Sequence, residues 1–177
     1  KPKKINQITA NQEAELMEKI VCRDARSRDC VEVARLFKKM WDENRPEMAL
    51  EDKAIDMLIE ELVKSVQLPN MYLKVGVLNG KIVSFLFGSV SFQRRMNRLV
   101  GYCYDIYVEP ELRKTNLGVK MIEDVKDWGR KQGASIALFI VHGKDLHKWF
   151  KRRGYEEFQT TFSIDLTQDD EPVAEVS

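Results

Sequence analysis

The sequence lacks any apolar run long enough to cross a membrane, and no signal-peptide pattern precedes its first predicted helix. It has only three cysteines, Cys22, Cys30 and Cys103, and their spacing forms no pair. Such a set is typical of reduced thiols in a cytoplasmic protein. Histidine is equally scarce, because only His142 and His147 are present, five residues apart. This spacing gives no metal-binding motif, and we expect no metal.

An excess of charge of either sign is also missing, since 29 basic and 28 acidic residues leave a formal net charge of +1. This balance argues against a general affinity for nucleic acid or for an anionic membrane. Arg94, Arg95 and Arg98 form a local basic turn, which is a weak signal for nucleic-acid binding. A hydrophobic share of 44% in 177 residues is sufficient for the core of one domain.

What the sequence does contain is a regular series of helix patterns. Good helix formers follow Thr9, which is placed as a cap, with Gln12 three residues later. Two longer amphipathic helices are predicted over about 28–43 and 51–66. The remaining helices are expected from Gly118 to about residue 133 and over 144–153.

Strand patterns alternate with these helices, and an Asn79-Gly80 turn joins two of them as a hairpin. The predicted strands are 20–24, 72–78, 82–91, 102–108, 134–141 and 158–166. We therefore predict a single α/β domain over 20–166, with a mixed, mostly antiparallel sheet of six or seven strands and helices on both faces. An N-terminal extension with an extra short helix (1–19) precedes it, and an acidic disordered tail (167–177) follows.

The most informative segment runs from a strand through a proline-led loop into an amphipathic helix. Tyr102–Val108 supplies the strand, and Pro110 ends it. Arg113 and Lys114 precede the helix, and Gly118 leaves its first turn open to a ligand. Such a junction directs free backbone N–H groups and the positive end of a helix at one point, which suits a pyrophosphate.

This segment resembles the coenzyme A-binding core of the GNAT superfamily, the acyl-coenzyme A-dependent N-acyltransferases. The family signature is Arg or Gln, two residues, Gly, one residue, then Gly or Ala, and it falls here on Arg113, Asn116 and Gly118. Asn116 replaces the middle Gly, and Asn is the non-Gly residue that best tolerates a left-handed backbone. The order of elements fits as well, from an opening strand at 20–24 to a closing Gly154-Tyr155 pair.

The resemblance implies an N-acyltransferase in which a primary amine attacks the thioester of acetyl-coenzyme A directly. In the family, the pantetheine arm lies along the signature strand, where this strand splays from the next one. The positions that match the coenzyme A site are Ile106, Tyr107, Val108, Arg113, Lys114, Thr115, Asn116, Leu117, Gly118 and Val119.

The catalytic residues are less clearly marked. Tyr102 stands where some family members have a Glu base, Asp105 lies on the same strand, and His142 follows the apolar strand near the expected thioester. The family often has a Tyr general acid where this chain has Phe150, and an Asn where it has Gly143. These two departures favour an alternative, a non-catalytic GNAT-like binding or regulatory module.

Eight acidic side chains gather in and between the two amphipathic helices, in the region that borders the acceptor site in the family. They are Asp42, Glu43, Glu47, Glu51, Asp52, Asp56, Glu60 and Glu61. A negative rim favours a cationic acceptor, either a small-molecule amine or a lysine of a peptide or protein. An ordinary solvated helix surface explains the same residues equally well. The sequence leaves a homodimer open and favours neither a membrane nor a nucleic-acid partner.

Overall fold

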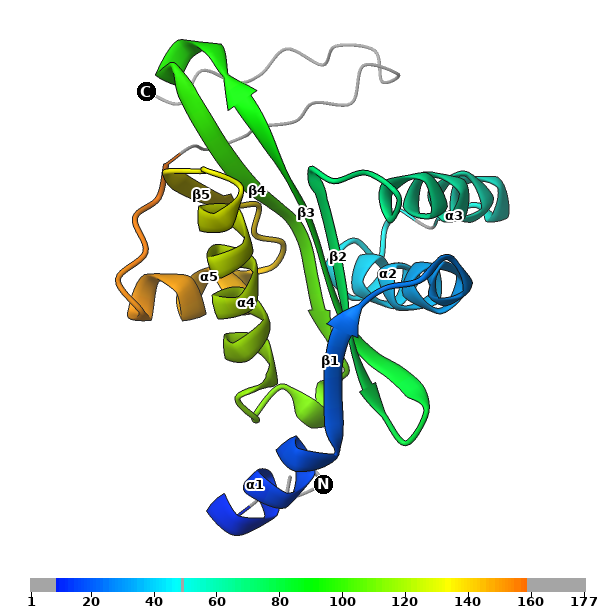
Figure 1. Cartoon of the computed structure of the whole chain (residues 1–177). Helices are drawn as coiled ribbons and strands as arrows, with labels where there is room; N and C mark the ends of the chain where they lie inside the picture. Colours follow the sequence, from blue (N-terminus) through cyan, green and yellow to red (C-terminus); the bar gives the residue numbers. More distant parts are fainter. Residues whose placement is uncertain (1–8, 49, 159–177) are drawn as a thin grey trace, which may run out of the picture.

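The computed structural model describes residues 9–48 and 50–158. Its centre is one five-stranded sheet whose strands lie in the order of the chain, β1-β2-β3-β4-β5. Strands β1 to β4 are antiparallel neighbours, and β5 is parallel to β4. Helices α2 and α3 cover one face of the sheet, and α4 and α5 cover the other (Figure 1). The predicted α/β class is therefore confirmed.

The elements match most of the predicted helices and strands. The strands are β1 (Ile20–Asp24), β2 (Met71–Leu78), β3 (Lys81–Gln93), β4 (Arg98–Val108) and β5 (Ile136–Phe139). The α-helices are α1 (Ala10–Lys19), α2 (Cys30–Asn44), α3 (Asp52–Ser65), α4 (Leu117–Lys131) and α5 (Lys144–Arg152). Single turns of 3₁₀-helix, η1 (Ser27–Asp29), η2 (Arg94–Met96) and η3 (Pro110–Leu112), join them.

The prediction of six or seven strands is not matched, because the described segments hold five. The apolar run 134–141 forms a strand only over Ile136–Phe139, since β5 pairs with β4 only between Val100 and Cys103. The predicted strand 158–166 lies outside the described residues except for Phe158, and so does the predicted acidic tail. Among the helices that the structure describes, none is both long and apolar enough to span a membrane.

The core is divided by the sheet into two apolar clusters. On the α2–α3 side, Leu36 packs with Val75 and Phe85, and each of these side chains is almost fully buried. On the α4–α5 side, Leu117 and Met121 have no exposed surface. Full burial of one such side chain stabilises the fold by about 1.5–3 kcal/mol. The apolar stripes of the amphipathic helices therefore dock both helical layers firmly on the sheet.

A β-bulge interrupts the pairing of β3 with β4. Phe87 is opposite Asp105, but Gly88 is opposite Cys103, so Tyr104 is an extra residue in β4. Such an insertion bends a strand and increases its twist. A side chain at position 88 would collide with the Tyr102 carbonyl oxygen. Gly88 therefore permits β3 to approach β4 closely beside the bulge, next to Asp105 of β4.

We predict that Gly88→Ala destabilises the protein, because the new methyl group meets backbone that cannot move without disturbing the bulge. The loss in free energy of unfolding should be about 1–3 kcal/mol, as for other overpacked sites. Gly129→Ala is the matched control. Gly129 lies inside helix α4, and a Cβ added there meets only the Ala134 Cβ, at 3.9 Å. This control should gain about 0.5–1 kcal/mol from helix propensity. Urea titration measures both, and an equal effect of the two substitutions would contradict the argument.

Candidate active site

Strands β4 and β5 form a fork. Their pairing ends at Cys103 and Phe139, and the Ile140 N–H makes a last hydrogen bond of 2.8 Å to the Cys103 carbonyl. Beyond this point β4 continues to Val108, whereas the chain after β5 turns away toward α5. In the described part of the chain, no strand pairs with this edge of β4 past Cys103. The backbone of Ile106–Val108 therefore has no strand partner on this side among the described residues.

Asp105 and His142 meet at the opening of this fork. The Asp105 Oδ1 lies 3.5 Å from the His142 Nε2, and only 14% of the Asp105 side chain is exposed. Burial raises the pKa of Asp105 to about 6, while His142 acts to lower it and the neighbouring charge of Glu61 raises it further. A carboxylate with a pKa near 6 is largely ionised at neutral pH and still basic enough to accept a proton.

Tyr102, the third predicted catalytic residue, belongs to a separate contact group. Its ring is parallel to that of Tyr104, with ring centroids 6.1 Å apart, and its hydroxyl accepts a hydrogen bond of 3.2 Å from Gln93 Nε2. Tyr104 in turn shares a hydrogen bond of 2.7 Å with Ser89. The structure thus brings Asp105 and His142 together and holds Tyr102 in a tyrosine stack on the β3–β4 hairpin. Sequence analysis did not identify Ser89 or Tyr104.

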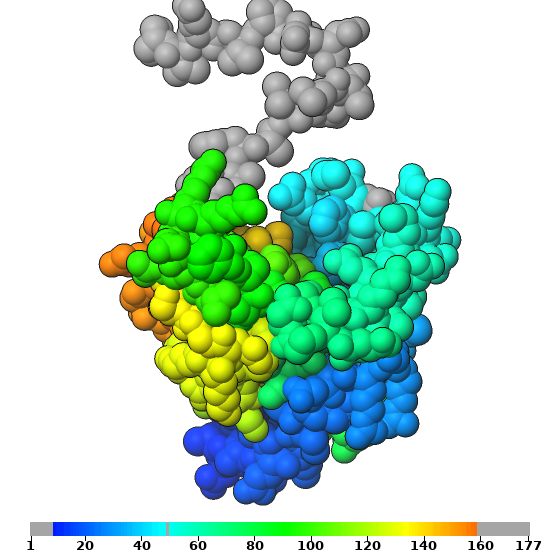
Figure 2. All heavy atoms as spheres, turned by 45° about the horizontal axis from the view of Figure 1, so that its top comes forward, coloured from blue at the N-terminus to red at the C-terminus, as the bar shows by residue number. Residues whose placement is uncertain are grey.

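The space beside the hairpin is visible from outside. Figure 2 shows a hollow between the β3–β4 hairpin, in green, and the segment of α2 and α3, in cyan. Within the acidic rim, Asp42 binds Lys38 at 2.9 Å, and Glu60 lies 3.9 Å from Lys64. Part of the predicted negative charge is therefore neutralised on the helices themselves.

The start of helix α4 has the geometry of an anion site. The buried Thr115 hydroxyl donates to the Leu112 carbonyl at 2.7 Å and accepts from the Leu117 N–H at 3.3 Å. The N–H groups of Gly118 and Val119 belong to the first helical turn and so lack partners within the helix. A Cβ on Gly118 would have only Val108 Cγ2 nearby, at 3.8 Å, so the approach to this turn is open.

Two observations revise the expected roles in this loop. Asn116 has φ −77° and ψ 7°, so the loop does not use the tolerance of Asn for a left-handed backbone. Its N–H donates to the Glu13 Oε1 of helix α1 at 2.9 Å. Sequence analysis missed this contact, because nothing in the local spacing links an N-terminal helix to a loop so far along the chain.

Arg113 and Tyr107 point toward helix α2. The Arg113 Nε donates to the Val108 carbonyl at 2.8 Å, and its Nη2 donates to the Glu43 Oε2 at 2.5 Å. The Tyr107 hydroxyl donates to the other Glu43 oxygen at 2.9 Å, and the Arg113 guanidinium lies over the Tyr107 ring. Burial, followed by the Glu43 hydrogen bond, raises the pKa of Tyr107. Glu43 therefore ties the end of β4 and the loop to α2.

The two departures from the family pattern have structural causes. Phe150 is buried among aromatic rings, with centroids 5.1 Å from Phe139 and 4.8 Å from Tyr155. Gly143 has φ 86° and ψ 147°, a backbone region that is essentially restricted to glycine. A side chain at 143 would also collide with the Asn44 amide of α2. An Asn at position 143 is thus incompatible with this backbone.

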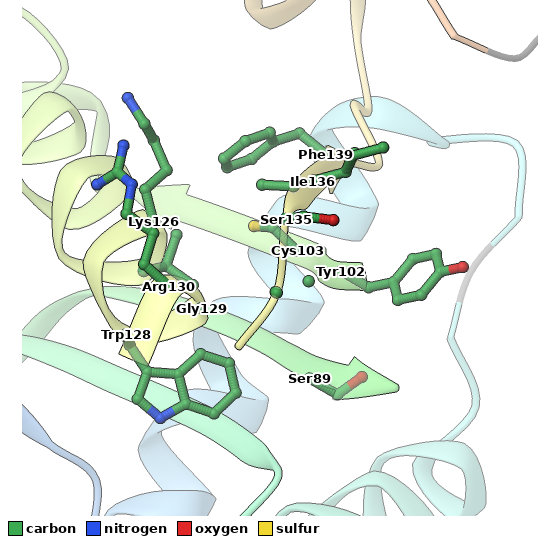
Figure 3. Close-up of a pocket in the computed structure, with 14 residues that line it drawn as sticks. Ser89, Tyr102, Cys103, Lys126, Trp128, Gly129, Arg130, Ser135, Ile136 and Phe139 are labelled. Carbon is green, nitrogen blue, oxygen red and sulfur yellow. The ribbon is translucent and has the colours of Figure 1, made fainter. Parts of the chain in front are cut away.

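A cavity of about 190 Å³ lies beside the paired half of β4 and β5 (Figure 3). Lys126, Trp128 and Arg130 of α4 line it together with residues of β5 and of the start of β4. It includes Tyr102 but neither Asp105 nor the start of α4, so it is distinct from the fork. Among the described residues, no three His, Cys, Asp or Glu side chains are grouped so that they could hold a metal ion.

Comparison with known proteins identifies the family. The sequence matches the model of the acetyltransferase (GNAT) family over residues 30–155, which is more than half of the chain. The chain belongs to the GNAT acetyltransferase family. The predicted resemblance is therefore confirmed. No curated protein matches the sequence.

Solved structures share the GNAT fold. An aminoglycoside acetyltransferase from an uncultured soil metagenomic sample, in complex with sisomicin, has a TM-score of 0.65 at 20% identity, covering 85% of this chain and 99% of that one. A predicted acetyltransferase with acetyl-CoA from Clostridium acetobutylicum has a TM-score of 0.72 at 12% identity, covering 84% and 97%. The aminoglycoside N-acetyltransferase AAC(6')-Iy in complex with CoA has a TM-score of 0.64 at 18% identity, covering 82% and 93%. At these identities the likeness concerns the fold alone.

The raised pKa of Asp105 predicts a specific dependence of stability on pH. Because this pKa rises from 3.8 to about 6 on folding, the folded protein keeps a proton that the unfolded chain releases. Stability contributed by the protonated group is thus complete below about pH 4 and is lost as pH rises toward 6. The free energy of unfolding of Asp105→Asn, minus that of the parent, should increase across this window by on the order of 2–3 kcal/mol. Denaturant titrations at several pH values measure this stability difference. A difference that does not change with pH would contradict the raised pKa of Asp105.

Proposed function

We propose that this chain is an N-acetyltransferase that transfers the acetyl group of acetyl-coenzyme A to a primary amine by direct attack. The observation that carries the proposal is the partly buried Asp105–His142 pair at the fork of β4 and β5. Membership of the GNAT acetyltransferase family supports it. Further support comes from neighbours of the same fold that hold acetyl-CoA or CoA, or that are aminoglycoside acetyltransferases.

In this proposal, acetyl-coenzyme A lies along the free edge of β4 and ends at the start of α4. The pantetheine amides pair with the backbone of Ile106–Val108, which has no strand partner on that side among the described residues. The pyrophosphate accepts hydrogen bonds from the N–H groups at the start of α4, where the helix dipole is positive. Lys114 adds positive charge beside it, whereas the predicted charge of Arg113 is paired with Glu43.

The proposed reaction needs a base that deprotonates the amine and a proton source for the departing thiolate. Ionised Asp105 takes a proton from the substrate ammonium, directly or through water, and His142 holds the carboxylate in place. The neutral nitrogen then attacks the thioester carbonyl carbon, so that a C–N bond forms and the C–S bond breaks. The departing thiolate takes up the second proton released by the nitrogen, by way of water, because Phe150 cannot donate one. No covalent enzyme intermediate is needed, and burial raises the pKa of the Cys103 thiol, which makes it a poor nucleophile.

A second candidate is a non-catalytic GNAT-like module that binds the cofactor for recognition or regulation. The placement of Phe150 in the aromatic core favours it, because the usual proton donor is then missing from the fork. The retained signature residues Arg113 and Gly118, together with the Asp105–His142 pair, favour the enzyme. Turnover therefore separates the two candidates, whereas cofactor binding alone does not.

We predict that Asp105→Asn lowers kcat by about 10²- to 10⁴-fold, the usual contribution of a general base. Its Kd for acetyl-coenzyme A should stay close to that of the parent, because the substitution does not touch the start of α4. For the parent, kcat/KM should rise with pH through about 6 as Asp105 ionises, and this limb should disappear in the variant. Asp145→Asn, on the exposed side of α5, is the matched control and should leave both constants unchanged.

Calorimetry with acetyl-coenzyme A and a thiol-release assay across a panel of amines provide these measurements. A parent protein that does not bind acetyl-coenzyme A at millimolar concentration would overturn the proposed function. Tight binding without thiol release on any amine would favour the module. Activity that is unchanged in Asp105→Asn would remove Asp105 from the base role while leaving the transferase reaction in place.

For the acceptor, we propose a cationic amine drawn to the hollow by the acidic rim. Glu47 and Glu51 are exposed in the connection between α2 and α3, where their charge reaches the solvent. Reversal of both charges to Lys should raise the apparent KM for the acceptor several-fold at low salt and less at high salt, because exposed charges are screened beyond about 10 Å at 0.1 M. The KM for acetyl-coenzyme A should stay the same in this double variant. The double reversal of Glu123 and Glu156, which are also exposed, is the control, and an equal response would show that only net charge matters.

A further inference from the structure

Helix α1 places a carboxylate on the start of helix α4. A capping box between Thr9 and Gln12 fixes where α1 begins and puts Glu13 in its first turn. The Glu13 Oε1 then accepts the Asn116 N–H at 2.9 Å. Figure 1 shows α1 at the foot of the sheet, below the segment that leads into α4.

The chemistry of this contact matches that of a bound phosphate. An anionic oxygen accepts a hydrogen bond from a backbone N–H at the positive end of a 15-residue helix. Asn116 stands at the middle position of the coenzyme A signature, so under the proposed function the same N–H faces the pyrophosphate. One N–H cannot serve a carboxylate and a phosphate oxygen at full strength together, and two anions this close repel each other.

Helix α1 is packed weakly enough to undock from the rest of the domain. Helix α1 has no buried residue. Only Leu16 and Met17, which are partly buried, pack against the apolar cluster under α4. The Glu13 contact itself is exposed to solvent. Release of α1 therefore exposes little apolar surface, and a phosphate bound at the Asn116 N–H opposes its docking by repelling Glu13.

We propose that Glu13 occupies the pyrophosphate site in the free protein, and that acyl-coenzyme A must displace helix α1 from it. The proposal rests on the proposed function, because it takes the start of α4 to be the cofactor's pyrophosphate site. Cofactor affinity is then set partly by a residue outside the cofactor site of the family. The N-terminal helix acts as an internal competitor, docked in the free state and released in the bound state.

The test compares the affinity of acetyl-coenzyme A for the parent, Glu13→Ala and the matched control Glu18→Ala. Ala keeps the helix propensity of α1, and Glu18 is an exposed carboxylate on the same helix. A carboxylate at a helix start contributes about 0.3–1 kcal/mol, so Glu13→Ala should lower the Kd about two- to fivefold, with no change in the control. Acetyl-pantetheine, which lacks the pyrophosphate, should bind all three proteins equally.

Hydrogen exchange supplies a second readout that does not depend on the variants. In the parent, amides of residues 10–19 should exchange faster when saturating acetyl-coenzyme A is added. Equal Kd values for parent and Glu13→Ala, or weaker binding by Glu13→Ala, would overturn the competition and leave the proposed function intact. An equal gain for acetyl-pantetheine would also overturn it, because the effect would then not arise at the pyrophosphate. If none of the three proteins binds acetyl-coenzyme A, both proposals fail.

Discussion

The whole site depends on how strand β4 is held by its neighbours. On one side β3 pairs with it along its entire length, with the bulge at Tyr104, and on the other β5 pairs only as far as Cys103. The first constraint fixes the backbone rigidly, and the second leaves half of one edge open. Asp105 lies where the two meet, next to the bulge and just beyond the last pair with β5. A buried carboxylate and an open strand edge therefore have a single structural cause.

Much of the fold was predictable from local patterns, because periodicity and turn chemistry act over a few residues. The Thr9–Gln12 capping box, the Asn79-Gly80 hairpin and the apolar stripe of α2 each formed as predicted. The length of β5 was not predictable. An apolar run such as 134–141 indicates burial, but whether it pairs as a strand depends on where its neighbour diverges. The predicted strand 158–166 stays a prediction.

The candidate site was predictable in outline and not in its contacts. The signature residues marked the start of α4, and both Asp105 and His142 were candidates, but their contact came only from the structure. The hydrogen bonds of Glu43 to Arg113 and of Glu13 to Asn116 join residues remote in sequence, and no local pattern encodes such a pair. Sequence therefore indicated which backbone segments form the candidate site, and it left open which side chains contact them.

Glu43 shows why charges in this site cannot be counted from the sequence. It belongs to the acidic rim by position, but its two oxygens bind Tyr107 and Arg113. The contact removes a negative charge from the rim and a positive charge from the cofactor loop at once. Under the proposed function, the field at the acceptor amine is set by the carboxylates that remain near the fork, above all Asp105. The pKa of Asp105 is raised by burial and by the charge of Glu61. Helix α2 thus links the proposed acceptor side to the proposed cofactor side through the two hydrogen bonds of Glu43.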